Sequence, residues 1–113
     1  MKIVAQQVTL DELGRMATGT FGNMVKAVVD VDRELLAVDA ELHSDLEALL
    51  LEDGSLQKNL WGINLYPEFH DEQFVEFDSL INMRPSQGNL SRGVDSPETR
   101  AAILRVLEKR IQR

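Results

Sequence analysis

The segment from Arg84 to Gly93 has the residue types and spacing of an anion-binding loop. Its two arginines offer forked donors, which can bind a carboxylate or a phosphate through paired hydrogen bonds. Its two glycines permit positive φ angles, which allow backbone N–H groups to turn inward toward a negative charge. We therefore expect a non-catalytic site for a small anionic ligand, formed by the side chains of Arg84, Gln87, Asn89, Ser91 and Arg92.

Two other interpretations of this segment stay open. Short polar side chains in a long loop often bind the backbone of that loop, so the segment can be purely structural. It can also bind another protein, in which case the chain is an interaction domain. The segment matches neither a Walker loop nor a dinucleotide fingerprint, and the pattern therefore names no particular ligand.

A second group of residues could perform acid–base or metal chemistry. Glu76 and Asp78 are two positions apart in a predicted strand and share one face, where paired carboxylates can act as acid and base. His43 could join them, and His70 could supply a further metal ligand. The alternative function is thus a metal-dependent or acid–base hydrolase. Neither an HExxH pair nor a calcium loop is present, and the sequence assigns no catalytic residue, metal ligand or cofactor.

The composition excludes several classes of protein. The chain has 113 residues and no cysteine, which excludes a disulfide framework, a thiolate zinc site and a cysteine nucleophile. With 43% hydrophobic and 27% charged residues, it fits one folded domain over residues 1–113. No apolar run approaches the length of a membrane span, and the N-terminus lacks the apolar core of a signal peptide. We expect a soluble cytoplasmic protein that does not contact membranes.

Charge is divided unevenly along the chain. The net charge is −7, but residues 1–83 carry 5 basic and 16 acidic side chains, whereas residues 84–113 carry 7 basic and 3 acidic ones. An acidic body repels phosphate backbones, so nucleic acid is not an expected partner. The basic C-terminal quarter could attract a small anion or dock on the acidic surface of a second copy, and a homodimer is therefore expected.

Three helices are predicted. Thr9 to Glu12 has the form of a capping box and begins a helix that ends at Gly19. Ser44 to Glu47 repeats this form and favours a second helix over residues 42–53, although a strand followed by a turn at Asp53-Gly54 is an alternative. The last helix begins after Ser96, and its expected buried stripe is Ile103, Leu104, Leu107 and Ile111.

Two hairpins are predicted from residues that alternate between apolar and polar. The first joins residues 25–31 to 35–38, and the second joins 60–66 to 74–84. If Tyr66 faces Phe74, Asn64 faces Glu76 and Gly62 faces Asp78. This register gathers the apolar side chains of the second hairpin on one face, which are Trp61, Ile63, Leu65, Val75, Phe77, Ile81 and Met83. The opposite face carries Asn64, Tyr66, Glu76, Asp78, Asn82 and Arg84.

Together these elements predict an α+β fold. Two hairpins form an antiparallel β-sheet, and the C-terminal helix packs on its apolar face to give a two-layer sandwich. Leu104 and Leu107 are expected to be buried there against residues such as Ile63 and Phe77.

Three strings in the chain are distinctive: ELHSDLEALLLEDGS at 41–55, LWGINLYPE at 60–68 and EFDSLINMRPSQGNLSRGV at 76–94. Through them the chain resembles, over almost its whole length, a family of small uncharacterised microbial proteins. The resemblance implies a domain of unknown function, with no reaction, substrate or catalytic residue assigned. That family often has a basic residue where this chain has Leu90, so no ligand role is expected for that side chain.

Overall fold

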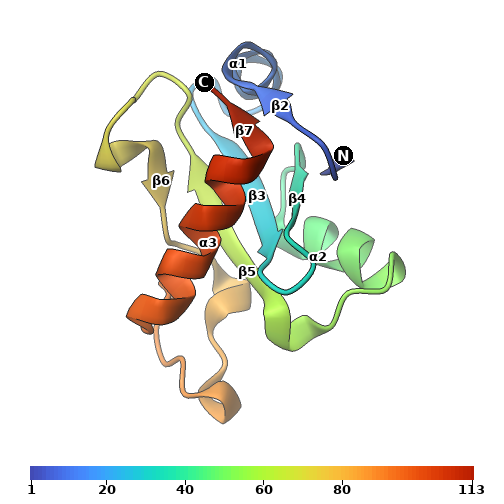
Figure 1. Ribbon diagram of the computed structural model, residues 1–113, viewed down its shortest axis with the longest axis vertical. Helices are drawn as coiled ribbons and strands as arrows, with labels where there is room; N and C mark the ends of the chain where they lie inside the picture. The colour runs from blue at the N-terminus through green and yellow to red at the C-terminus, as the bar shows by residue number, and fades with distance from the viewer.

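The computed structural model describes all residues from Met1 to Arg113. Its main sheet is antiparallel with strand order β1-β4-β3-β5-β6 (Figure 1). These strands are β1 (Lys2–Val4), β3 (Val25–Asp30), β4 (Leu35–Val38), β5 (Leu60–Leu65) and β6 (Val75–Glu76). Three helices accompany the sheet, α1 (Leu10–Gly19), α2 (His43–Glu52) and α3 (Pro97–Arg110). A small parallel pair, β2 (Val8–Thr9) and β7 (Ile111–Gln112), joins the two ends of the chain.

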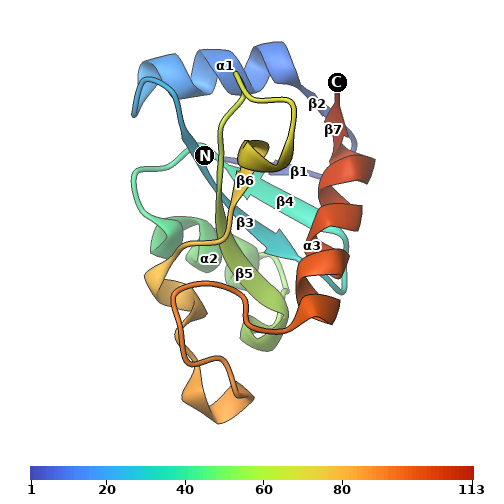
Figure 2. The ribbon, with the colours of Figure 1, turned by 90° about the vertical axis from the view of Figure 1, so that its left-hand side faces the viewer.

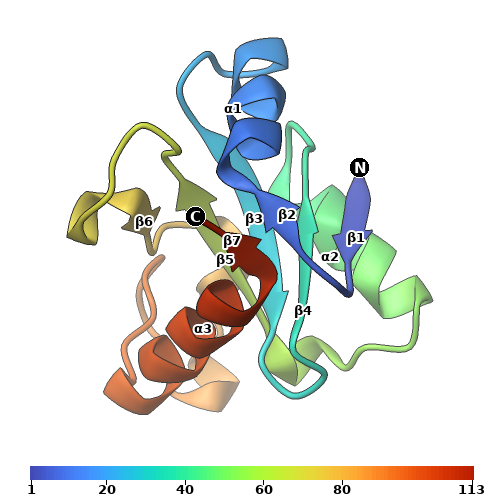
Figure 3. The same ribbon diagram turned by 45° about the horizontal axis from the view of Figure 1, so that its top comes forward.

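Helices cover both faces of the sheet. Helix α2 lies on one side of β3 and β5, and α3 lies on the other (Figure 2). Helices α1 and α3 share the same face, in front of the sheet in Figure 3. This arrangement confirms the α+β class, the antiparallel sheet and the C-terminal helix on one face, and it adds a covering helix on the opposite face.

The alternation of side chains along β3 explains why both faces are covered. Ala27 and Val29 pack in the larger core with Leu13 and Ile103, whereas Val28 points the other way. The smaller core on that side consists of Val28, Leu35, Ala37, Leu46, Leu50 and Leu60. Apolar residues on both faces of β3 and β4 therefore require two covering layers.

All three predicted helices are confirmed, with one correction to a cap. The hydroxyl of Thr9 accepts a hydrogen bond from the Glu12 amide at 3.1 Å, which closes the predicted capping box of α1. The hydroxyl of Ser96 accepts one from the Thr99 amide at 3.2 Å and caps α3. In α2, however, the N-cap is Leu42, Ser44 lies inside the helix, and no side chain caps the first turn. The predicted second capping box is wrong, and so is the strand alternative for residues 42–53.

The second hairpin has the predicted register but a shorter second strand. Asn64 pairs with Glu76 and Leu65 with Val75, after which β6 ends. The prediction placed Asp78 opposite Gly62, but in the structure the side chain of Asn82 pairs with Gly62 instead. Its Oδ1 accepts from the Gly62 amide at 2.8 Å and its Nδ2 donates to the Gly62 carbonyl at 2.9 Å.

Residues 77–84 consequently form no strand, and the predicted orientations of two of these residues, and of one on α3, are corrected. The 3-10 turn at Leu80–Asn82 directs Ile81 toward the core beneath α2, not toward Trp61. Met83 is 49% exposed and does not belong to the apolar face. On α3, Leu104 is 46% exposed, whereas Leu107 is buried as expected. The buried side chains of the C-terminal segment are Ile103, Val106, Leu107 and Ile111.

Candidate functional site

Arg84 lies inside the fold and binds backbone carbonyls. Its side chain is 8% exposed, and its Nε and Nη1 donate to the carbonyls of Ile81 and Gln57 at 2.9 and 2.8 Å. Its Nη2 donates to the carbonyl of Leu60. The guanidinium also lies 4.6 Å from the centre of the Trp61 ring, and its burial lowers its pKa. Arg84 thus links the loop to β5.

The side chain of Asn89 organises the loop from within. Its Nδ2 donates to the carbonyls of Asn82, Ser91 and Gly93 at 2.7, 3.1 and 2.8 Å. Its Oδ1 accepts from the Asp95 amide at 2.8 Å. Both N–H groups of the amide and one lone pair of its oxygen are therefore engaged within the loop.

Gln87 and Ser91 also bind within the protein. The Nε2 of Gln87 donates to the carbonyl of Lys58 at 3.2 Å. The Ser91 hydroxyl donates to Asp95 at 2.5 Å and accepts from the Gly93 amide at 3.1 Å. The structure therefore brings four of the five predicted site residues into one internally bonded unit.

Arg92 differs from the other four because only one of its nitrogens is engaged. Its Nε donates to Asp78 at 2.7 Å in an exposed ion pair, and its Nη groups make no hydrogen bond to the protein. Its backbone is held firmly, since its carbonyl accepts from the Ser79 amide and from Asn82 Nδ2, both at 2.9 Å. The protein thus fixes the backbone of Arg92 and leaves its cationic end accessible.

Arg92 borders a pocket of about 260 Å³, which we call the α2 pocket. The pocket lies between β3, the start of α2 and residues 79–92, and its walls are Lys26, Leu42, His43, Ser44, Ser79, Leu80, Ile81 and Arg92. No side chain caps α2, and the Asp45 amide donates to the Leu42 carbonyl at 3.2 Å, so the amides of His43 and Ser44 remain to bind a negative charge there. The sequence analysis did not identify Lys26 as a site residue, and nothing local in the sequence pairs it with Arg92.

His43 is the most buried titratable group of the α2 pocket. Its side chain is 8% exposed, and its Nε2 lies 2.8 Å from the Ile63 carbonyl. Because a carbonyl only accepts, Nε2 carries the proton and Nδ1 presents a lone pair that has no partner in the protein. Burial lowers the pKa of His43, which favours this neutral form.

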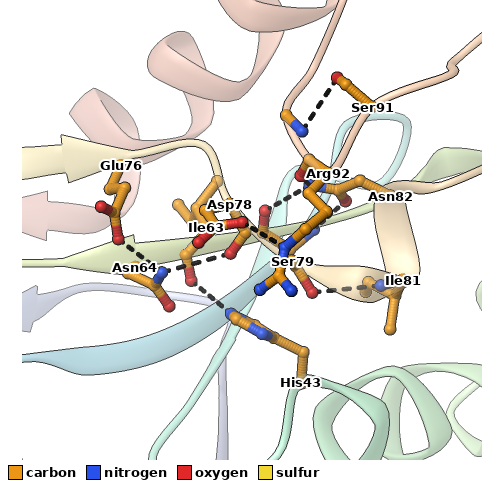
Figure 4. A network of polar contacts seen from close by, with 12 residues as sticks. His43, Ile63, Asn64, Glu76, Asp78, Ser79, Ile81, Asn82, Ser91 and Arg92 are labelled. Atoms are coloured by element: carbon orange, nitrogen blue, oxygen red, sulfur yellow. Dashed lines mark hydrogen bonds and ion pairs between the residues drawn. The ribbon is translucent and has the colours of Figure 1, made fainter.

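A row of polar side chains crosses three strands of the sheet, and Figure 4 shows two of them, Asn64 and Glu76, together with His43. Lys26, Asn64 and Glu76 are neighbours in register, so they share the face that α2 covers. Asn64 Nδ2 donates to Glu76 at 2.8 Å and Tyr66 donates to the same carboxylate oxygen at 3.0 Å. The Oδ1 of Asn64 is buried without a partner. Burial, with Glu76 nearby, raises the pKa of Tyr66.

The acidic residues of this region do not form a metal site. Glu76 is bound by Asn64 and Tyr66, and Asp78 is bound by Arg92. No group of three or more histidine and acidic side chains is placed to hold a metal ion. His70 lies instead in a separate groove with Leu10, Asp11, Gly14, Arg15, Thr18, Pro67 and Glu68.

A second groove, of about 470 Å³, lies between the predicted loop and the start of α3. It includes Gln87 and Asn89 of the loop and Ser96 at the start of α3. Two carboxylates also line it, those of Asp95 and Glu98. Hydroxyl and amide donors to these carboxylates lower the pKa of both, so they are negatively charged at neutral pH. This groove therefore repels anions more than the α2 pocket does.

No helix of the structure has the length and apolar character needed to cross a bilayer.

Comparisons with other proteins yield a family but no function: no curated protein and no solved structure matches the chain. Residues 2–110 match the model of one family, which is described as a protein of unknown function. This match confirms the expected membership of a family of unknown function, and the chain belongs to that family, DUF5674.

Proposed function

We propose that the protein binds a small anion in the α2 pocket without converting it chemically. The observation that supports this function is the convergence of two cationic side chains, Lys26 and Arg92, on a pocket that also contains the uncapped start of a helix. Each of these groups attracts negative charge, and a pocket concentrates their effect by limiting access of water.

The charge of the pocket favours an anion over a cation. Lys26 forms no ion pair and lies 5.2 Å from the centre of the Phe21 ring. Arg92 shares one nitrogen with Asp78 and keeps its Nη groups free. His43 is neutral, and Asp45, the acidic residue of the first turn of α2, does not line the pocket. The lining therefore carries a net positive charge even when Asp78 is counted.

In this proposal the residues predicted from the sequence have two different roles. Arg92 contacts the anion. Arg84, Gln87, Asn89 and Ser91 hold the loop in the conformation that places Arg92 at the pocket, through bonds to backbone groups and to Asp95.

Thermal unfolding with added sulfate, phosphate or acetate at constant ionic strength tests the proposal. A ligand at ten times its Kd stabilises the folded state by about 1.4 kcal/mol, which corresponds to a rise in Tm of roughly 5–10 °C for a domain of this size. Lys26→Gln and Arg92→Gln should each weaken the affinity by about two- to fivefold, as expected for partly exposed charge pairs.

Arg105→Gln is the matched control, because Arg105 is an exposed arginine on α3, on the opposite face of the sheet. It removes the same charge and should leave the affinity unchanged. The proposal fails if no anion raises the Tm of the wild-type protein, or if Arg105→Gln weakens binding as much as Arg92→Gln.

An acid–base hydrolase is the second candidate, and His43 is the observation that favours it. Its neutral imidazole has a free Nδ1 lone pair in the same pocket, which is the form that a general base requires. Hydrolysis of a panel of esters and phosphomonoesters tests this function. Turnover that is lost in His43→Gln but retained in Arg105→Gln would support it, and absence of turnover in the wild-type protein would reject it.

A further inference from the structure

The lining of the α2 pocket is not purely polar. Leu42 and Leu80 are 55% and 66% exposed and stand on its walls together with Ile81. An inorganic anion would leave this apolar surface in contact with water, whereas an anion with a hydrocarbon group would cover it. Each methylene buried in this way strengthens binding roughly fourfold.

The size of the pocket limits the ligand to a few heavy atoms. Its volume of about 260 Å³ is below the range of roughly 300–1,000 Å³ that is usual for sites of drug-sized ligands. A nucleotide or a long acyl chain would extend beyond this volume into solvent, whereas a short branched acid fits within it.

His43 adds a requirement for a hydrogen-bond donor. Its side chain is nine-tenths buried and lines the pocket, and its Nδ1 lone pair has no partner in the protein. An anion that fills the pocket displaces water from this acceptor, and without a hydrogen atom to donate it does not replace the lost hydrogen bond, whereas a hydroxyl group does. An ammonium group would also donate, but Lys26 and Arg92 on the same walls repel it.

We infer that the ligand of the α2 pocket is a short aliphatic 2-hydroxy monocarboxylate. Its carboxylate binds Lys26, Arg92 and the amides of His43 and Ser44 at the start of α2. Its hydroxyl donates to His43, and its alkyl group covers Leu42 and Leu80. The inference rests on the proposed function and narrows it from any small anion to one chemical class.

Isothermal titration of the wild-type protein with five probes tests the inference. The probes are 2-hydroxy-4-methylpentanoate, 4-methylpentanoate, lactate, 2-hydroxy-4-methylpentanamide and sulfate. The first should bind about three- to tenfold tighter than 4-methylpentanoate, which lacks the hydroxyl. It should bind at least about tenfold tighter than lactate, which has three fewer carbon atoms to bury, and about sixtyfold tighter if all three are fully buried. The uncharged amide should not bind measurably.

Two exposed leucines provide matched variants. Leu80→Ser should weaken 2-hydroxy-4-methylpentanoate at least threefold and leave lactate unchanged. Leu90→Ser is the control, because Leu90 is also exposed and does not line the pocket. His43→Gln should equalise the affinities of 2-hydroxy-4-methylpentanoate and 4-methylpentanoate. If that variant does not fold, the ratio of these two affinities in the wild-type protein alone decides whether the hydroxyl group is recognised.

The outcomes separate the inference from the function on which it rests. If sulfate and lactate bind as tightly as the branched hydroxy acid, anion binding stands and the inference is overturned. The inference is also overturned if Leu80→Ser and Leu90→Ser change the affinity for 2-hydroxy-4-methylpentanoate equally. If none of the anions binds, or if the amide binds as well as the acid, the proposed function itself fails.

Discussion

Replacing Asn82 with alanine removes the side chain that ends the second hairpin. Asn82 is fully buried and bonds both backbone groups of Gly62, while its Nδ2 also donates to the carbonyl of Arg92. The truncation leaves both backbone groups of Gly62 without partners and removes one of the two donors to the Arg92 carbonyl. An unsatisfied buried group costs about 1–3 kcal/mol. The Arg92 carbonyl keeps its bond from the Ser79 amide, which reduces its share of the cost.

The expected loss of stability in Asn82→Ala is therefore about 3–5 kcal/mol. Urea unfolding followed by the fluorescence of Trp61, the single tryptophan of the chain, measures it directly. Asn23→Ala is the control, because Asn23 is exposed and its side chain makes no hydrogen bond in the structure. A loss below about 1 kcal/mol in Asn82→Ala, similar to that of the control, would refute the role assigned to Asn82.

Four other predictions follow from the fold and the charges. Gly62→Ala should destabilise by about 1–3 kcal/mol in urea unfolding, because a Cβ there would lie 2.6 Å from the Cβ of Ser79. Leu107→Ala should cost about 2–5 kcal/mol in the same assay, and Leu104→Ala, on the exposed side of α3, less than about 1 kcal/mol. Burial holds the pKa of His43 below the ordinary value of about 6.5, so the unfolded chain binds the proton first as the pH falls. The free energy of unfolding should be highest above that value and decrease as the pH falls toward the folded pKa, a decrease that His43→Gln removes in urea titrations between about pH 7.5 and 5. The homodimer expected from the charge distribution predicts a sedimentation coefficient that rises with protein concentration at low salt, and a constant value for a monomer would reject it.

The sequence was sufficient to predict the helices and strands that are specified by a few neighbouring residues. The capping box at Thr9, the serine and proline at the start of α3, and the period-two pattern of residues 60–66 each specify geometry over a few residues. The pairing of Asn64 with Glu76 followed from this pattern, because a shift by one residue would move every apolar side chain of the hairpin to the other face.

The end of β6 could not be read from the same pattern. Residues 77–84 continue to alternate, yet the side chain of Asn82 binds Gly62 where the next pair of the ladder would form. The close contact between Gly62 and Ser79 is equally invisible in the sequence, since it joins residues from different elements. When a side chain replaces the backbone of a neighbouring strand as hydrogen-bond partner, the pattern of apolar and polar residues in the sequence does not change.

The burial of Arg84 was missed for a related reason. Arginine is rarely buried, and a binding role was the natural interpretation of one in a polar loop. The structure instead surrounds its guanidinium with the carbonyls of Gln57, Leu60 and Ile81, which satisfy its donors without a direct carboxylate partner. This environment exists only because the chain folds so that residues 57–60 lie next to the loop.

The two functional hypotheses raised by the sequence each involve one residue of the ion pair between Asp78 and Arg92. One hypothesis placed an anion on the loop, and the other placed acid–base chemistry on His43, Glu76 and Asp78. In the structure Arg92 and His43 line the same pocket, and Asp78 bonds Arg92 at its edge. Most donors of the loop bind the protein itself, and in the proposed function the loop therefore holds Arg92 on a fixed backbone at the pocket. Such a fixed cation beside a neutral imidazole favours recognition of a negatively charged ligand that also donates a hydrogen bond.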